Sequence, residues 1–195
     1  MSISLLIAVI CAYLIGSISS AVLICRITAN SDPRQVGSKN PGATNVYRVA
    51  GKKAAVLTLL ADILKGVIPV MIAKEFGMGT IEISIVAIAA LLGHVYPVFF
   101  KFQGGKGVAT VFGALLAFHW SIGVSLLFVW AAVFMLTRTS SLSAIIAALT
   151  IPLSSYYILP EALIPLNIIA IIVLWRHYDN ILKLFSGEER HFKKR

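Results

Sequence analysis

Apolar residues occupy seven stretches of the chain, each separated from the next by a short polar or glycine-containing segment. A helix needs about 20 apolar residues to cross the roughly 30 Å hydrocarbon core of a bilayer, and most of the stretches approach that length. The pattern predicts an all-α integral membrane protein, a bundle of seven transmembrane helices, with five or six crossings as open alternatives. The predicted spans are residues 3–25, 54–73, 81–100, 108–119, 121–137, 142–158 and 161–175.

The stretch 108–119 is the shortest, and a re-entrant or deeply buried helix is the alternative to a full crossing there. Composition agrees with the membrane class. Of the 195 residues, 58% are hydrophobic and 13% are charged, with a mean hydropathy of +0.90, whereas a soluble domain has about 25% charged residues. No polar segment is long enough for a second domain, so we predict one domain over residues 1–195, with residues 190–195 as a basic tail.

The formal net charge of +9 suggests nucleic acid as a partner only until the positions of the charges are considered. With seven spans, 15 of the 17 Lys and Arg residues fall on one side, in residues 26–53, 101–107, 138–141 and 176–195. Basic loops mark the cytoplasmic side of a membrane protein. We therefore predict an outside N-terminus, a cytoplasmic C-terminus and no nucleic-acid partner. All the polar motifs lie on the cytoplasmic side, which argues against a pore.

The first motif, residues 37–48, reads GSKNPGATNVYR. Its glycines, proline and asparagines are ordinary turn formers, so a simple connection between helices is one reading. A turn does not explain the many hydrogen-bond donors, however, and a planar guanidinium suits a phosphate. We favour an anion site. The candidate donors are Ser38, Asn40, Thr44, Asn45 and Arg48.

The second motif, residues 102–110, reads FQGGKGVAT. A nucleotide-binding P-loop would need glycine where Phe100 stands and Ser or Thr where Gly107 stands, so this is not one. Glycines still let successive N–H groups converge on an anion at the start of a helix. We predict an anion-binding loop, with a flexible connection as the alternative. Its residues are Gly104, Gly105, Lys106, Gly107 and Thr110.

The third motif begins where the last span ends. His177 and Asn180 are three residues apart and share one face of a helix, whereas Arg176 and Lys183 are interpreted as interface anchors. Ser141, in the short turn 138–141, either caps the next helix or reaches the site. Inside the second span, Asp62 and Lys65 have the spacing of an ion pair, and a functional role is equally open.

The chain lacks other familiar catalytic patterns. No histidine is followed five residues later by aspartate, as the common glycerolipid acyltransferase signature requires, and no carboxylate cluster suggests a metal pair. Cys11 and Cys25 have no metal-site spacing and are interpreted as small packing residues. We expect no metal and no cofactor.

Taken together, GSKNPGATNxxR, GGKGVAT and RHxxNIxKLxxGxE resemble the motifs of the bacterial acyl-phosphate:glycerol-3-phosphate acyltransferases, the PlsY family. The resemblance runs from the first helix to Glu189. It implies transfer of a fatty acyl group from acyl phosphate to the sn-1 hydroxyl of glycerol 3-phosphate, giving lysophosphatidic acid and phosphate in phospholipid synthesis. It also implies the bacterial cytoplasmic (inner) membrane. Whether the chain docks the soluble acyltransferase that makes acyl phosphate is left open.

By match to the family's motifs, the resemblance implies catalytic or substrate-binding roles for a set of polar residues and Gly104, Gly105 and Gly107 as the phosphate loop. Two departures are visible: Lys39 stands where many members have glycine, and Lys183 where arginine is common. The polar residues are Ser38, Arg48, Lys106, Ser141, His177, Asn180 and Glu189.

The expected chemistry suits these residues, because acyl phosphate carries a good leaving group and catalysis then rests on positioning and charge stabilisation. The proton acceptor is either His177 or the phosphate of glycerol 3-phosphate, and the absence of an evident carboxylate–histidine pair favours the phosphate. A phosphate-compound transporter is the rival class, against which stand the one-sided polarity and the lack of an inverted repeat. A regulatory protein that merely binds an anionic lipid is the second rival.

Overall fold

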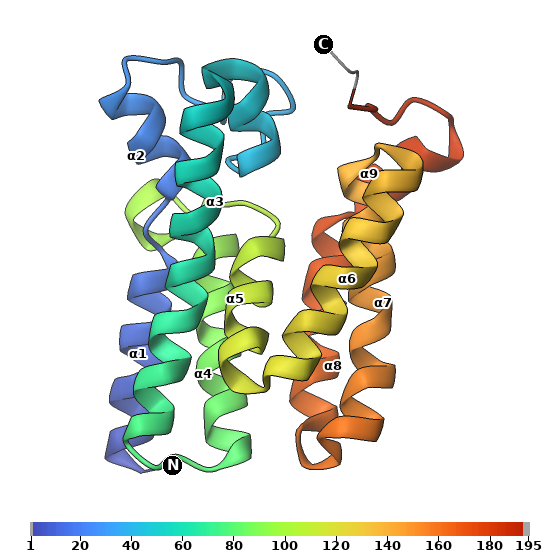
Figure 1. Cartoon of the computed structure of the whole chain (residues 1–195). Helices are drawn as coiled ribbons and strands as arrows, with labels where there is room; N and C mark the ends of the chain where they lie inside the picture. Colours follow the sequence, from blue (N-terminus) through green and yellow to red (C-terminus); the bar gives the residue numbers. More distant parts are fainter. Residues whose placement is uncertain (1, 193–195) are drawn as a thin grey trace.

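The computed structural model describes residues 2–192, and every regular element in that range is helical (Figure 1). Two short 3-10 turns, η1 (Val98–Phe100) and η2 (Pro160–Ala162), interrupt the α-helices. The α-helices are α1 (Ile3–Gly16), α2 (Ser20–Ile27), α3 (Ala43–Glu75), α4 (Thr80–Val95), α5 (Val108–Phe118), α6 (Trp120–Thr137), α7 (Ser140–Ile158), α8 (Leu163–Arg176) and α9 (Tyr178–Phe185).

The seven predicted apolar stretches all fall largely in helices, and the all-helical membrane class is confirmed. Five segments are long and apolar enough to cross a bilayer, and α8 with α9, bent by 56° at their junction, would make a sixth. Helix α5 has only 11 residues. At 1.5 Å per residue it is about 16 Å long, half the hydrocarbon core. Within residues 2–192, length and composition thus identify five to six spans, and the predicted seventh is α5, which is too short to qualify by this measure.

The helices form two groups that face each other, α1 to α5 on one side and α6 to α9 on the other (Figure 1). Helix α3 packs on α5 through glycines that leave no room for a side chain. A Cβ on Gly66 would lie 2.1 Å from the Thr110 carbonyl oxygen, and one on Gly113 would lie 2.2 Å from that of Ile63. Small residues at such crossings let membrane helices approach closely, so α5 is held tightly against α3.

The predicted boundaries shift in two places. The first apolar stretch is not one continuous helix, because the chain breaks between α1 and α2. The first polar motif, which the predicted spans leave in a connection, becomes helical from Ala43 onward, so Thr44, Asn45 and Arg48 lie on the first turns of α3. Helix α3 then bends at Gly51, whose φ of 83° lies in the left-handed region that favours glycine.

The three polar motifs gather at one end of the bundle, where the C-terminal segment also lies (Figure 1). That segment runs back toward α6 and α3: the Phe192 N–H donates to the Arg138 carbonyl at 2.8 Å, and the Phe192 ring lies 5.4 Å from the Arg48 guanidinium. Apolar side chains such as Leu60 and Phe128, midway along α3 and α6, are exposed on the outer surface. The polar motifs therefore lie at one end of a bundle whose outer surface is largely apolar.

Candidate active site

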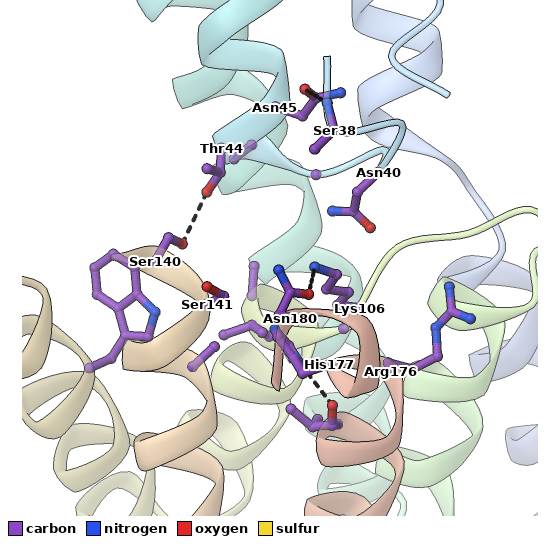
Figure 2. Close-up of a pocket in the computed structure, with 18 of the residues that line it drawn as sticks. Ser38, Asn40, Thr44, Asn45, Lys106, Ser140, Ser141, Arg176, His177 and Asn180 are labelled. Carbon is purple, nitrogen blue, oxygen red and sulfur yellow. Dashed lines mark hydrogen bonds between the residues drawn. The ribbon is translucent and has the colours of Figure 1, made fainter. Parts of the chain in front are cut away.

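One cavity of about 890 Å³ lies between the two helix groups and brings together residues from all three motifs (Figure 2). Its deeper wall is apolar and includes Phe112, Leu126 and Ile151. Most of the residues predicted for the site line it, among them Ser38, Asn40, Thr44, Asn45, Arg48, Gly104, Lys106, Gly107, Ser141, His177, Asn180 and Glu189.

Asn45 organises the loop before α3 and has no free amide left for a ligand. Its buried side chain donates to the Pro33 and Val36 carbonyls at 2.8 and 3.0 Å and accepts from the Ser38 N–H at 2.9 Å. Gly37, with φ of 67°, gives it the space it needs. Asn45 therefore shapes the first motif, although the sequence pattern suggested a donor to substrate.

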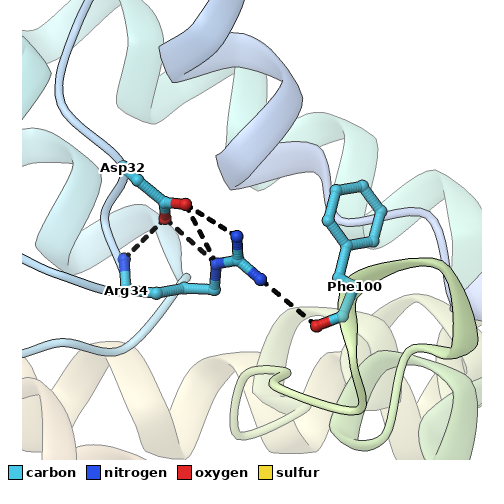
Figure 3. Close-up of polar contacts among 3 residues, drawn as sticks. All are labelled: Asp32, Arg34 and Phe100. Carbon is cyan, nitrogen blue, oxygen red and sulfur yellow. Dashed lines mark hydrogen bonds and ion pairs between the residues drawn. The ribbon is translucent and has the colours of Figure 1, made fainter.

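Arg34 joins this loop to the segment that leads into the glycine-rich loop (Figure 3). Its guanidinium pairs with Asp32 at 2.7 Å and donates to the Phe100 carbonyl at 3.2 Å. The hydrogen bond from Arg34 lowers the pKa of the Asp32 carboxyl, which favours the charged form of the pair. The two anion-binding loops predicted from the sequence are thereby fixed relative to each other.

Two serine residues at the start of α7 face the first motif. Ser140 and Thr44 share a hydrogen bond of 3.2 Å between their hydroxyls, which links α7 to α3 across the cavity. The neighbouring Ser141 hydroxyl is buried and, within residues 2–192, has no hydrogen-bond partner (Figure 2). A buried hydroxyl without a partner costs free energy, so Ser141 is placed to bind a group that enters the cavity.

Lys106 reaches from the glycine-rich loop to α9, where its ammonium donates to Asn180 Oδ1 (Figure 2). The other end of that amide, Asn180 Nδ2, donates to Glu189 at 2.8 Å. Lys106 is thus bonded to a neutral amide, with the carboxylate one residue further away. Its positive charge is oriented without being cancelled by direct contact.

The electrostatic setting of Lys106 disfavours the ammonium form. Burial, with smaller contributions from the cations Arg176 and Lys183, lowers its pKa to about 8, while Glu189 acts in the opposite direction. An anion that enters the cavity would raise the pKa of Lys106 again, because a nearby negative charge favours the ammonium form. The site is therefore suited to an anionic ligand.

Arg176, interpreted from sequence only as an interface anchor, also holds the glycine-rich loop. Its guanidinium donates to the Gly105 and Gly104 carbonyls at 3.3 and 3.4 Å and lies 5.9 Å from the Tyr96 ring. Arg176 thereby fixes two carbonyls of the loop, while the Gly105 N–H is used by the His94 carbonyl at 3.1 Å. No sequence signal separates this arginine from an ordinary membrane-edge cation.

His177 occupies the bend between α8 and α9. Its Nδ1 lies 2.8 Å from the Val173 carbonyl, so a neutral ring donates from Nδ1 and keeps Nε2 as an acceptor. Within residues 2–192, no carboxylate lies at ion-pair distance from this ring. Nor do three or more His, Cys, Asp or Glu residues in that range gather where a metal ion could bind.

Thr110 and Gly105 do not line the cavity. The Thr110 hydroxyl is fully buried and lies 3.2 Å from Nδ1 of His94, on α4 behind the loop. The sequence placed Thr110 with the phosphate donors because it falls in the first turn of α5. The spacing could not show that this turn faces inward, onto a histidine that sequence reasoning had left unassigned.

The arrangement as a whole suits an amphiphile with an anionic head. Cationic and hydroxyl groups, with several carboxylates among them, line one end of the cavity, and apolar side chains from α3, α5, α6 and α7 line the other. A ligand could keep a phosphate at the polar end while its hydrocarbon part lies among the helices. The chemistry it supports is charge stabilisation by positioned donors.

A family model described as glycerol-3-phosphate acyltransferase matches residues 6–187. Among curated relatives, the chain is 47% identical over 190 residues to the glycerol-3-phosphate acyltransferase of Idiomarina loihiensis, covering 97% of both chains. It is 49% identical over 182 residues to that of Pseudomonas entomophila, covering 93% of this chain and 96% of the relative.

Two solved structures are similar over 97% of this chain and 96% of theirs. They are crystal structures of PlsY, an integral membrane glycerol 3-phosphate acyltransferase. The glycerol 3-phosphate form matches with a TM-score of 0.91 and 41% identity, and the lysophosphatidic acid form with 0.90 and 39%.

Anion binding at Lys106 is predicted to depend on pH. The ammonium is present below a pKa of about 8 and is lost as the pH rises through it, so affinity for sulfate should fall by up to about tenfold per pH unit above 8. Sulfate keeps its charge across this range, and its binding to purified protein can be measured by isothermal titration calorimetry. Lys106→Arg, which stays charged, should remove the decline. A constant affinity from pH 7 to 10, or the same decline in Lys106→Arg, would contradict the assignment.

Proposed function

The chain belongs to the glycerol-3-phosphate acyltransferase family, and from that premise we propose that its acyl donor is acyl phosphate. The acyl group passes to the sn-1 hydroxyl of glycerol 3-phosphate, and the products are lysophosphatidic acid and inorganic phosphate. The observation that carries the proposal is the single cavity with donors for phosphate at one end and an apolar wall at the other. Both substrates carry a phosphate, and only the donor carries a hydrocarbon tail.

The two polar loops suit the two phosphates. The glycine-rich loop with Lys106 takes the acyl-phosphate head, because its helix α5 runs along the apolar wall that would hold the acyl chain. Ser38, Arg48 and the buried Ser141 hydroxyl, on the opposite rim, take glycerol 3-phosphate. In this arrangement the acyl carbonyl of one substrate lies beside the hydroxyl of the other, and proximity supplies much of the rate.

The reaction is a direct displacement. The sn-1 oxygen forms a bond to the acyl carbon, and the bond from that carbon to the phosphate oxygen breaks, so phosphate leaves with the electron pair. Lys106 stabilises the charge that develops on the leaving oxygens. Phosphate is a good leaving group, so the step requires no strong general acid.

The hydroxyl proton goes to the phosphate of glycerol 3-phosphate. Within residues 2–192 no carboxylate contacts His177, and its Nδ1 is held by the Val173 carbonyl, so the ring lacks the partner that usually stabilises an imidazolium. His177 then orients the substrate through Nε2. Its part in the reaction is positional.

For the membrane topology we propose an outside N-terminus, with the site facing the cytoplasm of a bacterial cytoplasmic membrane and α5 completing the seven-span arrangement. The basic connections and Arg190 share the end of the bundle that holds the site, and the rest of the predicted basic tail, from residue 193 on, lies outside the described residues. We expect Ser186→Cys in a background lacking Cys11 and Cys25 to resist a membrane-impermeant maleimide in intact cells and to react in lysed cells. Labelling in intact cells would reverse the orientation.

The reaction is tested with purified protein in detergent or lipid mesophase. We expect phosphate release and lysophosphatidic acid only when acyl phosphate and glycerol 3-phosphate are both present. Acyl-CoA in place of acyl phosphate should give no product, since the site is proposed for a phosphate leaving group. Product from acyl-CoA, or none from acyl phosphate, would overturn the proposed donor. A transporter or a lipid-binding regulator would show no release at all.

His177→Ala in the same assay tests the proton acceptor. Removal of a positioning ring should lower kcat by about 10- to 100-fold and leave turnover measurable. A loss of several orders of magnitude, with binding of both substrates intact, would assign the general base to His177 instead.

A further inference from the structure

A buried polar network lies against the glycine-rich loop, and two of its members, Asp62 and His94, also line the cavity. Lys65 and Asp62 on α3 form an ion pair of 2.8 Å, and the Lys65 ammonium also donates to the Ile18 carbonyl at the break between α1 and α2. Nδ1 of His94 on α4 lies 3.7 Å from Asp62 and 3.2 Å from the Thr110 hydroxyl. The Asp62–Lys65 ion pair, one of the two roles left open from the sequence, is present, and His94 and Thr110, which touch the loop, lie beside it.

The loop rests on His94. The Gly105 N–H donates to the His94 carbonyl at 3.1 Å, and a Cβ on Gly105 would lie 2.2 Å from Nε2 of the ring. Gly104 is equally close, because its Cβ would lie 2.1 Å from the same carbonyl oxygen. Both glycines before Lys106 therefore pack on this one residue, which meets the loop with its ring and its backbone.

Charge balance alone does not explain the histidine. Asp62 is already paired with Lys65, so its charge is balanced without an imidazole, although its buried Oδ1 lacks a partner with hydrogen-bond geometry within residues 2–192. An apolar side chain at position 94 would fill the space, yet it could not bond Thr110, and burial of unpaired polar groups in a membrane bundle is costly. What the His94 side chain adds is a polar contact with Thr110, after Lys106, and a ring that packs against Gly105, before it, whereas the Gly105 N–H bonds the His94 backbone carbonyl.

We propose that His94, oriented by its hydrogen bond with Thr110 and lying beside Asp62, is a positioning residue for acyl transfer that sets the glycine-rich loop and through it the Lys106 ammonium. Arg176 holds the same glycines from the opposite side by their carbonyls. The loop is clamped between α4 and α8, so its N–H groups and Lys106 keep a fixed geometry. The inference rests on the proposed role of Lys106 at the acyl-phosphate head.

A double-mutant cycle tests it, using His94→Ala, Lys106→Gln and the combined variant in the lysophosphatidic acid assay. We expect His94→Ala to lower kcat by about 100-fold with the KM for glycerol 3-phosphate changed by less than about threefold. In the Lys106→Gln background, His94→Ala should lower kcat by less than about threefold, because the ammonium that His94 positions is already absent. His94→Asn, which keeps a polar atom near Nδ1, should recover about tenfold over His94→Ala.

The control is His119→Ala, at the turn between α5 and α6 away from the cavity, which should leave kcat unchanged. If His94→Ala does not fold, as judged by thermal unfolding, His94→Asn takes its place in the cycle. Equal losses from the His94 change in both backgrounds, or full activity of the His94 variants, would overturn the inference. Full activity of Lys106→Gln alone would instead refute the proposed role of Lys106.

Discussion

The hydrogen bond between Lys106 and Asn180 is the contact on which the rest of the site depends. A buried lysine is usually neutralised by a carboxylate, but here the ammonium meets an amide, and Glu189 lies beyond it. The charge is thus held in place and remains available to a phosphate. A carboxylate in direct contact with the Lys106 ammonium, in place of the Asn180 amide, would stabilise the empty site but weaken its binding of anions.

Holding that charge requires a rigid frame at the edge of a bilayer. The lysine sits on a loop of glycines, which has little stiffness of its own. Helices α4 and α8 hold the loop in place through His94 and Arg176. Helix α3 adds rigidity through its close contact with α5. The apolar wall then continues downward from the loop, so a lipid head and tail can each meet their preferred surroundings at the same time.

The hydrophobic pattern predicted the helical membrane class, and the unusual density of donors predicted the residues around the cavity. Length arguments were less reliable, because α5 is about half a bilayer long and still packs as a full member of the bundle. Asn45 and Thr110 show the other limit: residue type identifies a donor, but only the fold shows whether it faces ligand or backbone. Arg176 and His94 were missed because their partners are backbone carbonyls and glycines, which leave no spacing pattern.

The central claim is that this protein works by holding two phosphates side by side, without a covalent acyl-enzyme. The Ser141 hydroxyl is buried at the cavity without a hydrogen-bonded base in the described part of the chain, so no activated nucleophile is at hand. Initial rates measured over a grid of acyl phosphate and glycerol 3-phosphate concentrations test this most directly. The account predicts intersecting double-reciprocal lines, the pattern of a ternary complex. Parallel lines, the pattern of an acyl-enzyme formed before the second substrate binds, would contradict it.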